Sequence, residues 1–385
     1  MKVALSVLGK FHTFDLARQL HARGSLARIF TGYPRYKLRE EQIPEALINT
    51  YPWVNTPYLA FPQRERLGAT LLRGWEYLNC VSFDRHTASL MPECDVFVGL
   101  SSSTLWSGRR AKSLGARFVC DRGSSHIRKQ DELLRDEHTR WRLPYLPIDP
   151  RIIAREEAEY AEADAITVPS SFSARTFHEL GVPRSKVHQL SYGVNLEAFH
   201  PTGSPSTDSF DVLFVGVADL RKGVPYLLQA FKALQHPRKT LSFAGAFSPR
   251  MVRQMRDLGL WSDGIQLLGH LGWSQLRDRM SRSHALVLPS IEEGFGLVIP
   301  QALACGCPVI ATEHTGAPDL FNDGEAGHIV PIRQVETLTD RLQSLADDPA
   351  TRERMSQRAL QVVNHIGGWR TYGDNALSLY QSLLT

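Results

Sequence analysis

Residues 285–306 read ALVLPSIEEGFGLVIPQALACG, and this stretch decides the fold. Its first part, Ala285–Pro289, is a short apolar run of the kind that forms a buried strand in a parallel sheet. Pro300 lacks an N–H and is tolerated only near the start of a helix, so a helix is predicted to begin near Leu297. The stretch therefore predicts a strand, a turn and a helix whose N-terminal N–H groups face the turn.

The turn inside this stretch is acidic and rich in glycine. Gly294 and Gly296 allow the backbone to approach a ligand closely, because they carry no Cβ. Glu293 stands just before the helix, where its carboxylate can accept hydrogen bonds from sugar hydroxyls. Gln301 follows about two helical turns further on. We therefore expect this turn to form part of a binding site for a polar ligand.

The alternation of short apolar runs and longer helical patterns extends in both directions from this stretch. In the first half it predicts strands at Lys2–Leu8, Asp95–Leu100, Arg117–Cys120 and Ala165–Pro169, and helices at Phe14–Arg23, Leu105–Leu114 and Ile152–Ala163. In the second half it predicts strands at Asp211–Val217, Thr240–Ala244, Ala285–Pro289 and Val309–Ala311, and helices at Val224–Leu234 and Val335–Asp347. Such β–α alternation is typical of α/β domains with a parallel sheet and helices on both faces.

Two domains of this kind are predicted, because 385 residues are more than one domain usually holds. Residues 200–209, HPTGSPSTDS, are rich in Pro, Gly, Ser and Thr and form the best candidate linker. The first domain is placed at 1–199 and the second at 210–369, and a C-terminal helix within 370–385 is expected to complete the first domain. Ligands of parallel sheets bind at the carboxyl ends of the strands, so the cleft between the two domains is the expected site.

The composition is that of an ordinary globular protein, with 43% hydrophobic and 22% charged residues. The net charge of +4 is too small for a dedicated nucleic-acid-binding protein, and no nucleic acid partner is expected. Five cysteines without a C-x-x-C pair fit a reducing compartment better than a disulfide framework or a zinc site. No apolar run approaches the roughly 20 residues that cross a bilayer, so a cytoplasmic location is expected.

The excess positive charge lies in the first half, which carries a net charge of +5 over residues 1–200 against −1 over residues 201–385. Many of its basic residues, Arg64 and Arg66 among them, lie between Arg35 and Arg142. Such a surface can meet an anionic partner, for example the inner face of the cell membrane. Ordinary scatter of solvated charges is the alternative interpretation.

A second candidate site lies in residues 214–223, FVGVADLRKG. A strand ends at Gly216, and the loop that follows brings Arg221 and Lys222 to the start of a helix. Two cations beside free helical N–H groups favour an anion, most simply a diphosphate, although two solvated surface cations are the alternative. The common nucleotide motifs are absent, since there is no GxxxxGK[ST], and Gly9-Lys10-Phe11-His12 follows the first strand in place of GxGxxG.

These motifs make the chain resemble the retaining glycosyltransferases of family 4, whose signature is a Glu, seven residues and a second Glu within E-G-F-G-L-x-x-x-E-A-x-A-x-G-x-P-V. Residues 293–309 match almost every position of that signature. Residues 192–199 (YGVNLEAF), the 221–223 loop and residues 309–327 fit the same family. The clear match runs from 192 to 330, a little over a third of the chain, and the first domain resembles the family only loosely.

The resemblance implies a GT-B architecture, in which two Rossmann-like domains face a central cleft, and it implies a role for particular residues. The implied catalytic residues are His126, Glu293, Arg221 and Lys222. The implied donor and nucleotide contacts are Gly9, Lys10, Gly216, Arg221, Lys222, His270, Glu293, Gly294, Phe295, Gly296, Leu297 and Gln301. The acceptor-side candidates are His12, Arg122 and Ser124, and no residue is expected to bind a metal.

Two positions depart from the family pattern. Gln301 replaces the second Glu, which in the family usually binds the ribose of the nucleotide, and Gln keeps the hydrogen bonds but loses the charge. Val217 stands where the family often carries an Arg, a charge for which Arg221 could compensate. The Gln leaves open a catalytically silent nucleotide-sugar-binding homologue, and the fold also admits a nucleotide-sugar epimerase.

The resemblance implies a specific reaction. The enzyme would transfer a sugar from a nucleotide diphosphate sugar with retained anomeric configuration and without a metal cofactor, since no clear D-x-D motif follows a strand. A UDP-sugar is the favoured donor and a GDP-sugar the second choice. A glycan or lipid-linked acceptor would place the enzyme in cell-surface polysaccharide or glycolipid synthesis, at the membrane periphery.

Overall fold

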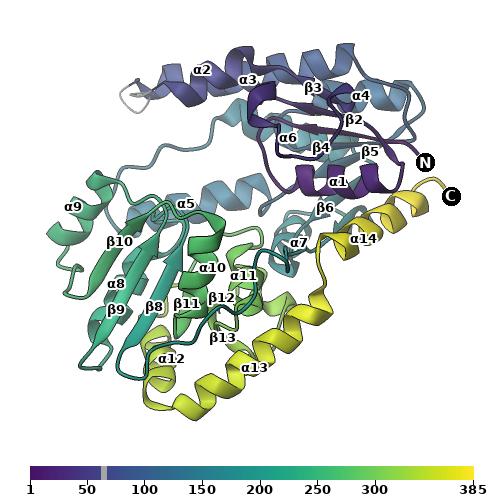
Figure 1. The fold of residues 1–385 in the computed structure, drawn as a ribbon. Helices are drawn as coiled ribbons and strands as arrows, with labels where there is room; N and C mark the ends of the chain where they lie inside the picture. Colours follow the sequence, from purple (N-terminus) through teal and green to yellow (C-terminus); the bar gives the residue numbers. More distant parts are fainter. Residues whose placement is uncertain (62–66) are drawn as a thin grey trace.

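The computed structural model describes residues 1–61 and 67–385. Arg64 and Arg66, two of the basic residues of the first half, lie outside the described residues. Within the described ranges the chain forms a seven-stranded and a six-stranded sheet, each covered by helices (Figure 1). All paired strands run parallel. The predicted α/β class with two facing domains is therefore confirmed.

The first sheet has the strand order β3-β2-β1-β4-β5-β6-β7. Its strands are β1 (Val3–Val7), β2 (Leu26–Thr31), β3 (Ile48–Thr50), β4 (Val96–Leu100), β5 (Arg117–Asp121), β6 (Ala165–Val168) and β7 (Val187–Gln189). β1 pairs with both β2 and β4, and all five of its residues are buried. An apolar run buried on both faces is what the sequence of a central parallel strand predicts.

The second sheet has the strand order β10-β9-β8-β11-β12-β13. Its strands are β8 (Phe210–Val215), β9 (Lys239–Ala244), β10 (Ile265–Gly269), β11 (Ala285–Leu288), β12 (Val309–Thr312) and β13 (Gly327–Val330). The order of the strands reverses between β8 and β11, so the loops after these two strands lie at the switch point of the sheet. This is the position at which parallel sheets bind ligands.

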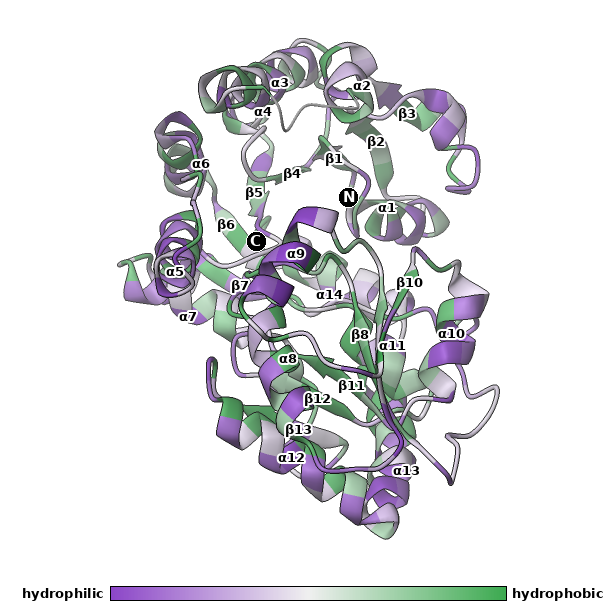
Figure 2. Cartoon of the chain, turned by 90° about the vertical axis from the view of Figure 1, so that its left-hand side faces the viewer, coloured by the Kyte–Doolittle hydropathy of each residue, from purple (hydrophilic) through white to green (hydrophobic). Residues whose placement is uncertain are grey.

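Helices cover both sheets. Those of the first domain are α1 (Thr13–Ala22), α2 (Pro52–Ala60), α3 (Ala69–Ser89), α4 (Leu105–Ser113), α5 (Ile127–Arg140), α6 (Pro150–Glu162) and α7 (Ser171–Glu179). Those of the second half are α8 (Val224–Ala233), α9 (Pro249–Asp257), α10 (Trp273–Ser281), α11 (Val298–Ala304), α12 (Val335–Asp347), α13 (Pro349–Ile366) and α14 (Trp369–Ser382). In Figure 2 the strands are largely hydrophobic and the outer helix faces, as on α12, are hydrophilic.

The C-terminal helix α14 leaves the second domain and returns to the first (Figure 1). Tyr372, Ala376 and Tyr380 are buried in the core around β1 and α1. Arg23, at the end of α1, donates a hydrogen bond of 2.9 Å to the carboxylate of Asp374. The chain therefore crosses between the domains twice. Among the described residues, none of the helices is both long and apolar enough to cross a membrane.

Candidate active site

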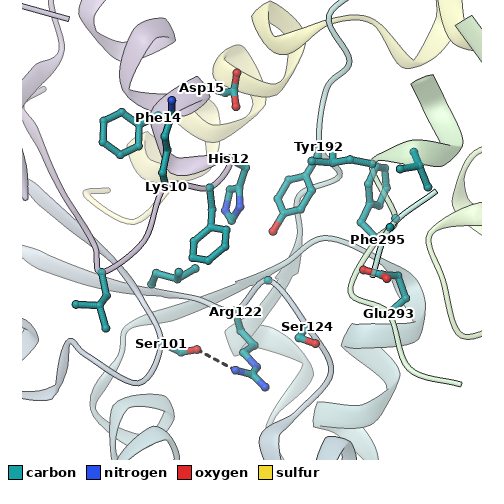
Figure 3. Close-up of a pocket in the computed structure, with 18 of the residues that line it drawn as sticks. Lys10, His12, Phe14, Asp15, Ser101, Arg122, Ser124, Tyr192, Glu293 and Phe295 are labelled. Carbon is teal, nitrogen blue, oxygen red and sulfur yellow. Dashed lines mark hydrogen bonds between the residues drawn. The ribbon is translucent and has the colours of Figure 1, made fainter. Parts of the chain in front are cut away.

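A cavity of about 1140 Å³ lies between the two domains at the carboxyl ends of the strands. The first domain contributes the loops after β1, β4 and β5, and the second contributes the loops after β8 and β11. Figure 3 labels lining residues from the loops after β1, β4, β5 and β11. The predicted site residues that line the cavity are Lys10, His12, Arg122, Ser124, Gly216, Lys222, Glu293, Phe295, Gly296 and Leu297. The loops of both sheets that sequence reasoning selected therefore converge on one space.

Lys222 and Glu293 form an ion pair at the wall of the cavity. Their loops are held together by Gly223, whose φ is +67° and where a Cβ would lie 1.9 Å from the carbonyl oxygen of Pro289. Only glycine fits at this point. Burial, together with the neighbouring charge of Arg221, lowers the pKa of Lys222 to about 7. The carboxylates of Asp219 and Glu292 oppose that shift because they favour the charged ammonium.

Arg221 and Glu292 form a second ion pair beside the first, with 3.2 Å between Nη1 and Oε2. The side chain of Glu292 is fully buried and also accepts hydrogen bonds from Ser124, Ser125 and Gln130 of the first domain. Burial raises the pKa of this carboxyl, but the charge of Arg221 and the serine hydrogen bonds outweigh it and lower the pKa to about 2. The sequence analysis did not select Glu292. The signal was available, because Glu292 and Glu293 are adjacent carboxylates just as Arg221 and Lys222 are adjacent cations.

Gly294 is a point of close contact between the two domains. A Cβ at this position would lie 1.9 Å from the carbonyl oxygen of Gly123. The carbonyl oxygen of Gly294 accepts a hydrogen bond of 2.6 Å from the hydroxyl of Ser170. Gly294 thus serves contact between the domains, and it is not among the residues that line the cavity. The cavity is therefore seen in a closed form, with the turn after β11 pressed against the loop after β5.

On the first-domain side, His12 lies deep in the cavity wall. Its Nε2 is 2.6 Å from Oδ2 of Asp121, and its ring stacks on Tyr192 at 4.1 Å. Asp121 also accepts a hydrogen bond of 2.9 Å from the hydroxyl of Thr167, which fixes the carboxylate. Tyr192 in turn contacts Phe295 of the second domain edge to face. This wall is thus a packed aromatic surface with an imidazole bound to a carboxylate. The sequence analysis did not select Asp121 as a site residue.

The mouth of the same wall carries paired charges. The carboxylate of Glu41 binds Lys10, and it also accepts a hydrogen bond of 2.6 Å from Arg18, which pairs further with Asp15. Lys10 is therefore balanced by a carboxylate in this structure. The described residues hold no group of three His, Cys, Asp or Glu side chains placed to bind a metal ion.

Two family profiles match the chain. The one described as "Glycosyl transferases group 1" matches residues 197–362, and the one described as "Glycosyl transferase 4-like domain" matches residues 11–193. The chain belongs to the group 1 glycosyltransferases. The two matches correspond to the two halves of the fold, so the family assignment rests on both domains, including the first, which resembled the family only loosely by its motifs.

Curated relatives match parts of this group 1 chain. D-inositol 3-phosphate glycosyltransferase 1 of Catenulispora acidiphila is 29% identical over 258 residues, 61% of each chain. A glycogen synthase of Mycobacterium tuberculosis is 30% identical over 180 residues, 46% of this chain and 43% of the other. The matched part thus spans about three fifths or less of these relatives.

The solved structures agree with the sheet topology over almost the whole chain. Sucrose-phosphate synthase from Thermosynechococcus elongatus has a TM-score of 0.76 at 21% identity and covers 100% of this chain and 99% of its own. Anabaena HepE, solved in complex with UDP and glucose, has a TM-score of 0.72 at 16% identity and covers 99% and 100%. These likenesses establish the GT-B fold of this group 1 chain.

His126, predicted to be catalytic, lies outside the cavity lining. His126 is the N-cap of α5, and its Nδ1 accepts a hydrogen bond of 3.2 Å from the backbone N–H of Arg128. Its ring packs between Tyr160 and Phe177 in the core of the first domain. Burial lowers its pKa to about 4, so the ring is neutral at pH 7. His126 is absent from the cavity lining because it faces the helix rather than the cleft.

Arg122 lines the cavity, but its guanidinium points into the first domain. It donates to the carbonyl oxygen of Ser125, to Gln130 and to the buried carboxylate of Glu156, at 2.9, 2.9 and 3.0 Å. Burial opposes its charge, but Glu156 outweighs this effect and raises the pKa of Arg122. The dashed line in Figure 3 marks one further bond, to Ser101. The charged group of Arg122 therefore supports the loop, and its acceptor-side role stays a prediction.

Four other predicted residues lie outside the cavity lining. Arg221 faces Glu292, Gly9 adjoins the lining residue Lys10, and His270 is exposed directly after β10. Gln301 is the fourth residue of α11 and is half-buried. The donor contacts assigned to these residues stay predictions.

Proposed function

We propose that this chain transfers a sugar from a nucleotide diphosphate sugar to a hydroxyl group of an acceptor. A UDP-sugar is the favoured donor, a GDP-sugar the second choice, and a glycan or lipid-linked sugar the acceptor. The observation that carries the proposal is the Lys222–Glu293 ion pair at the wall of an interdomain cavity of about 1140 Å³. A cation and a carboxylate at one wall suit the two parts of such a donor, the diphosphate and the sugar.

The leaving diphosphate needs positive charge as the glycosidic bond breaks. Lys222 faces the cavity, and Arg221 lies beside it in the same loop. In a closed site with little water, such fixed charges stabilise a developing anion far more than they would in bulk solvent. We propose that these cations, with the N–H groups of the Gly296–Leu297 turn, take the place of a metal ion.

Glu293 would change partner when the donor binds. Without a donor its carboxylate binds Lys222. With the diphosphate on Lys222, the carboxylate is free to accept hydrogen bonds from hydroxyls of the donor sugar. Phe295 and Gly296 would present backbone groups to the same donor, and Gln301 would reach the ribose. The ion pair thus keeps both charges satisfied until the substrate replaces each partner.

The acceptor would enter along the part of the cavity wall that carries His12 and Ser124 (Figure 3). Attack on the face that the diphosphate leaves would retain the anomeric configuration, with the leaving phosphate taking the acceptor proton. The close contact at Gly294 supports exclusion of water, which otherwise competes as acceptor. A lipid-linked acceptor would place the enzyme in the cytoplasm at the periphery of the membrane, in polysaccharide or glycolipid synthesis.

The proposal is tested by donor binding and turnover. Thermal unfolding is measured with UDP-glucose, GDP-mannose and ADP-glucose, and the donor that binds should raise the melting temperature by mass action. Slow release of free sugar from that donor, with EDTA present, is then followed by NMR, which reports the first anomer formed. Turnover without metal and retention support the proposal. Binding without turnover would favour a silent homologue, and loss of turnover in EDTA would contradict the metal-free step.

A further inference from the structure

The buried carboxylate of Glu292 connects the first domain to the loop after β8 that carries Arg221 and Lys222, which we call the cation loop. It belongs to the second domain, but three of its partners, Ser124, Ser125 and Gln130, belong to the first. The hydroxyls of Ser124 and Ser125 lie 2.6 and 2.7 Å from Oε1, and the amide of Gln130 lies 3.1 Å from Oε2. The remaining partner is Arg221, at 3.2 Å from Oε2.

These partners divide between the two carboxylate oxygens. Oε1 accepts only from the serine loop of the first domain, including the backbone N–H of Ser125 at 3.1 Å. Oε2 is shared between Gln130 and Arg221. A charge with no solvent exposure is stable only when such donors surround it, so the first domain completes the environment that keeps Glu292 ionised.

The same network continues into the first domain. Gln130 accepts a hydrogen bond of 2.9 Å from Arg122 while it donates to Glu292, and Arg122 is paired at 3.0 Å with the buried Glu156. A continuous hydrogen-bond network therefore runs from Glu156 on α6 to Arg221. On the other side, the backbone N–H of Ile291 donates to the carbonyl oxygen of Arg221 at 2.8 Å, so the cation loop rests on the segment that carries Glu292.

We infer that Glu292 is a positioning residue, which ties the Arg221–Lys222 loop to the first domain and so orients the cation loop as the cleft closes. The consequence of this inference for diphosphate binding rests on the proposed function. The positioning of the loop by Glu292 does not depend on that function. When the first domain withdraws, Glu292 loses its serine and glutamine donors and Arg221 loses a fixed partner. The position of the Arg221 cation and the closure of the two domains are therefore coupled through the side chain of Glu292.

The decisive variants lie in the first domain and outside the cavity lining. Glu292→Gln would turn an amide N–H toward the donors of Gln130 and Arg221 and could prevent folding, so it is not the main test. The double substitution Ser125→Ala with Gln130→Ala removes two side-chain donors to Glu292, and neither residue lines the cavity or belongs to the Arg221–Lys222 loop. Ser173→Ala is the matched control, because its hydroxyl crosses the same interface to the carbonyl of Gly294, not to Glu292.

The first measurement needs no nucleotide. Hydrogen–deuterium exchange is followed in the peptide that contains residues 221–223, where the backbone N–H of Lys222 is bound to Asp219 and that of Gly223 to Leu220. The double variant should exchange at least about threefold faster there, although it is altered in the other domain, and Ser173→Ala should exchange as wild type. Unchanged exchange in the double variant overturns the inference, whatever the protein binds.

The second measurement uses UDP and calorimetry. Arg221→Gln is made in the wild-type, double-variant and Ser173→Ala backgrounds, and the loss of UDP affinity that it causes is compared. The loss should shrink at least about threefold in the double variant and stay unchanged with Ser173→Ala. Equal losses in all backgrounds overturn the coupling. Faster exchange in a protein that does not bind UDP would leave the positioning role intact and contradict the proposed function alone.

Discussion

Lys222 and Glu293 meet at the cavity wall as the inner of two adjacent ion pairs, and Arg221 and Glu292 form the outer one. The order of the residues in each loop explains this arrangement, since neighbouring cations face neighbouring carboxylates across the same gap. The inner pair faces the cavity, where substrate can separate it. The outer pair is held by the first domain and would stay paired during the reaction.

Removing either member of the inner pair should impair transfer. Lys222→Ala and Glu293→Ala are each expected to lower kcat/KM by at least about tenfold, because one removes charge from the diphosphate site and the other a partner of the donor sugar. The double variant should lose less than the product of the two, since the residues interact. Steady-state kinetics with the donor identified by thermal shift measures this.

Arg109→Ala is the matched control for these substitutions. Arg109 pairs with Glu162 at 2.9 Å on an exposed surface of the first domain. Loss of an exposed ion pair changes stability little, and here it should leave kcat/KM unchanged. Near-normal rates for both Lys222→Ala and Glu293→Ala, in proteins whose circular dichroism is unaltered, would show that the site is assigned to the wrong loop.

Much of the fold could be read from the sequence, because buried parallel strands and amphipathic helices have strong local patterns. The strands that contribute the loops after β1, β4, β5, β8 and β11 were all predicted within two residues of their bounds. The strands β2, β3, β7, β10 and β13 were not predicted. β3 and β7 have three residues each, and most positions of β10 are partly or fully exposed, so the apolar pattern is weak there.

The second-domain side of the site was the more predictable, because motif and backbone coincide there, although Lys10 and His12 of the first domain also line the cavity. In the first domain the sequence pointed to His126, since a polar residue after a strand end is a reasonable candidate. Position in the chain does not reveal where a ring faces, and His126 caps α5 while His12 lies at the cavity. The partners of Glu292 were equally hidden, because they belong to a loop far away in the sequence.

His126 should affect stability and its pH dependence rather than catalysis. Its folded-state pKa of about 4 lies below the ordinary value of 6.5, so its contribution is present above pH 6.5 and lost as the pH falls through 4. Asn also accepts the capping hydrogen bond, so His126→Asn keeps the cap without the titration. Between pH 7 and pH 5 the free energy of unfolding of wild type should fall by about 2 kcal/mol more than that of the variant.

Urea unfolding at the two pH values measures this difference, and transfer is assayed in parallel at pH 7.5. The expected transfer rate of His126→Asn is within about threefold of wild type, since the ring does not line the cavity. A large loss of kcat in a variant of normal stability would restore the catalytic assignment. Equal pH dependence in the two proteins would contradict the burial argument.

Gln301 provides a test of the ribose contact. Gln301→Glu restores the family's residue at the fourth position of α11, where the side chain is half-buried. A carboxylate accepts hydrogen bonds from ribose hydroxyls more strongly than an amide does. UDP affinity by calorimetry should stay equal or rise by up to about tenfold. Abolished UDP binding in a folded protein would mean that the side chain does not face the ribose.

A substitution at Gly294 can distinguish donor binding from closure of the two domains. An added Cβ would lie 1.9 Å from the carbonyl oxygen of Gly123 and 3.0 Å from the Cα of Ser124, and neither backbone can move away in the closed form. Gly294→Ala should therefore hold the cleft open while each domain folds normally. We expect UDP affinity to stay within about threefold of wild type and transfer to fall at least about a hundredfold, because a small misplacement of reacting groups is that costly.

The control for this substitution is Gly74→Ala on α3, where an added Cβ meets nothing within 4 Å. Its transfer rate and UDP affinity should match wild type, since alanine is favoured inside a helix. If Gly294→Ala transferred sugar at the wild-type rate, the contact between the turn after β11 and the loop after β5 would not belong to the reacting state. The closed cleft, and with it the exclusion of water by the first domain, would then have no part in the reaction.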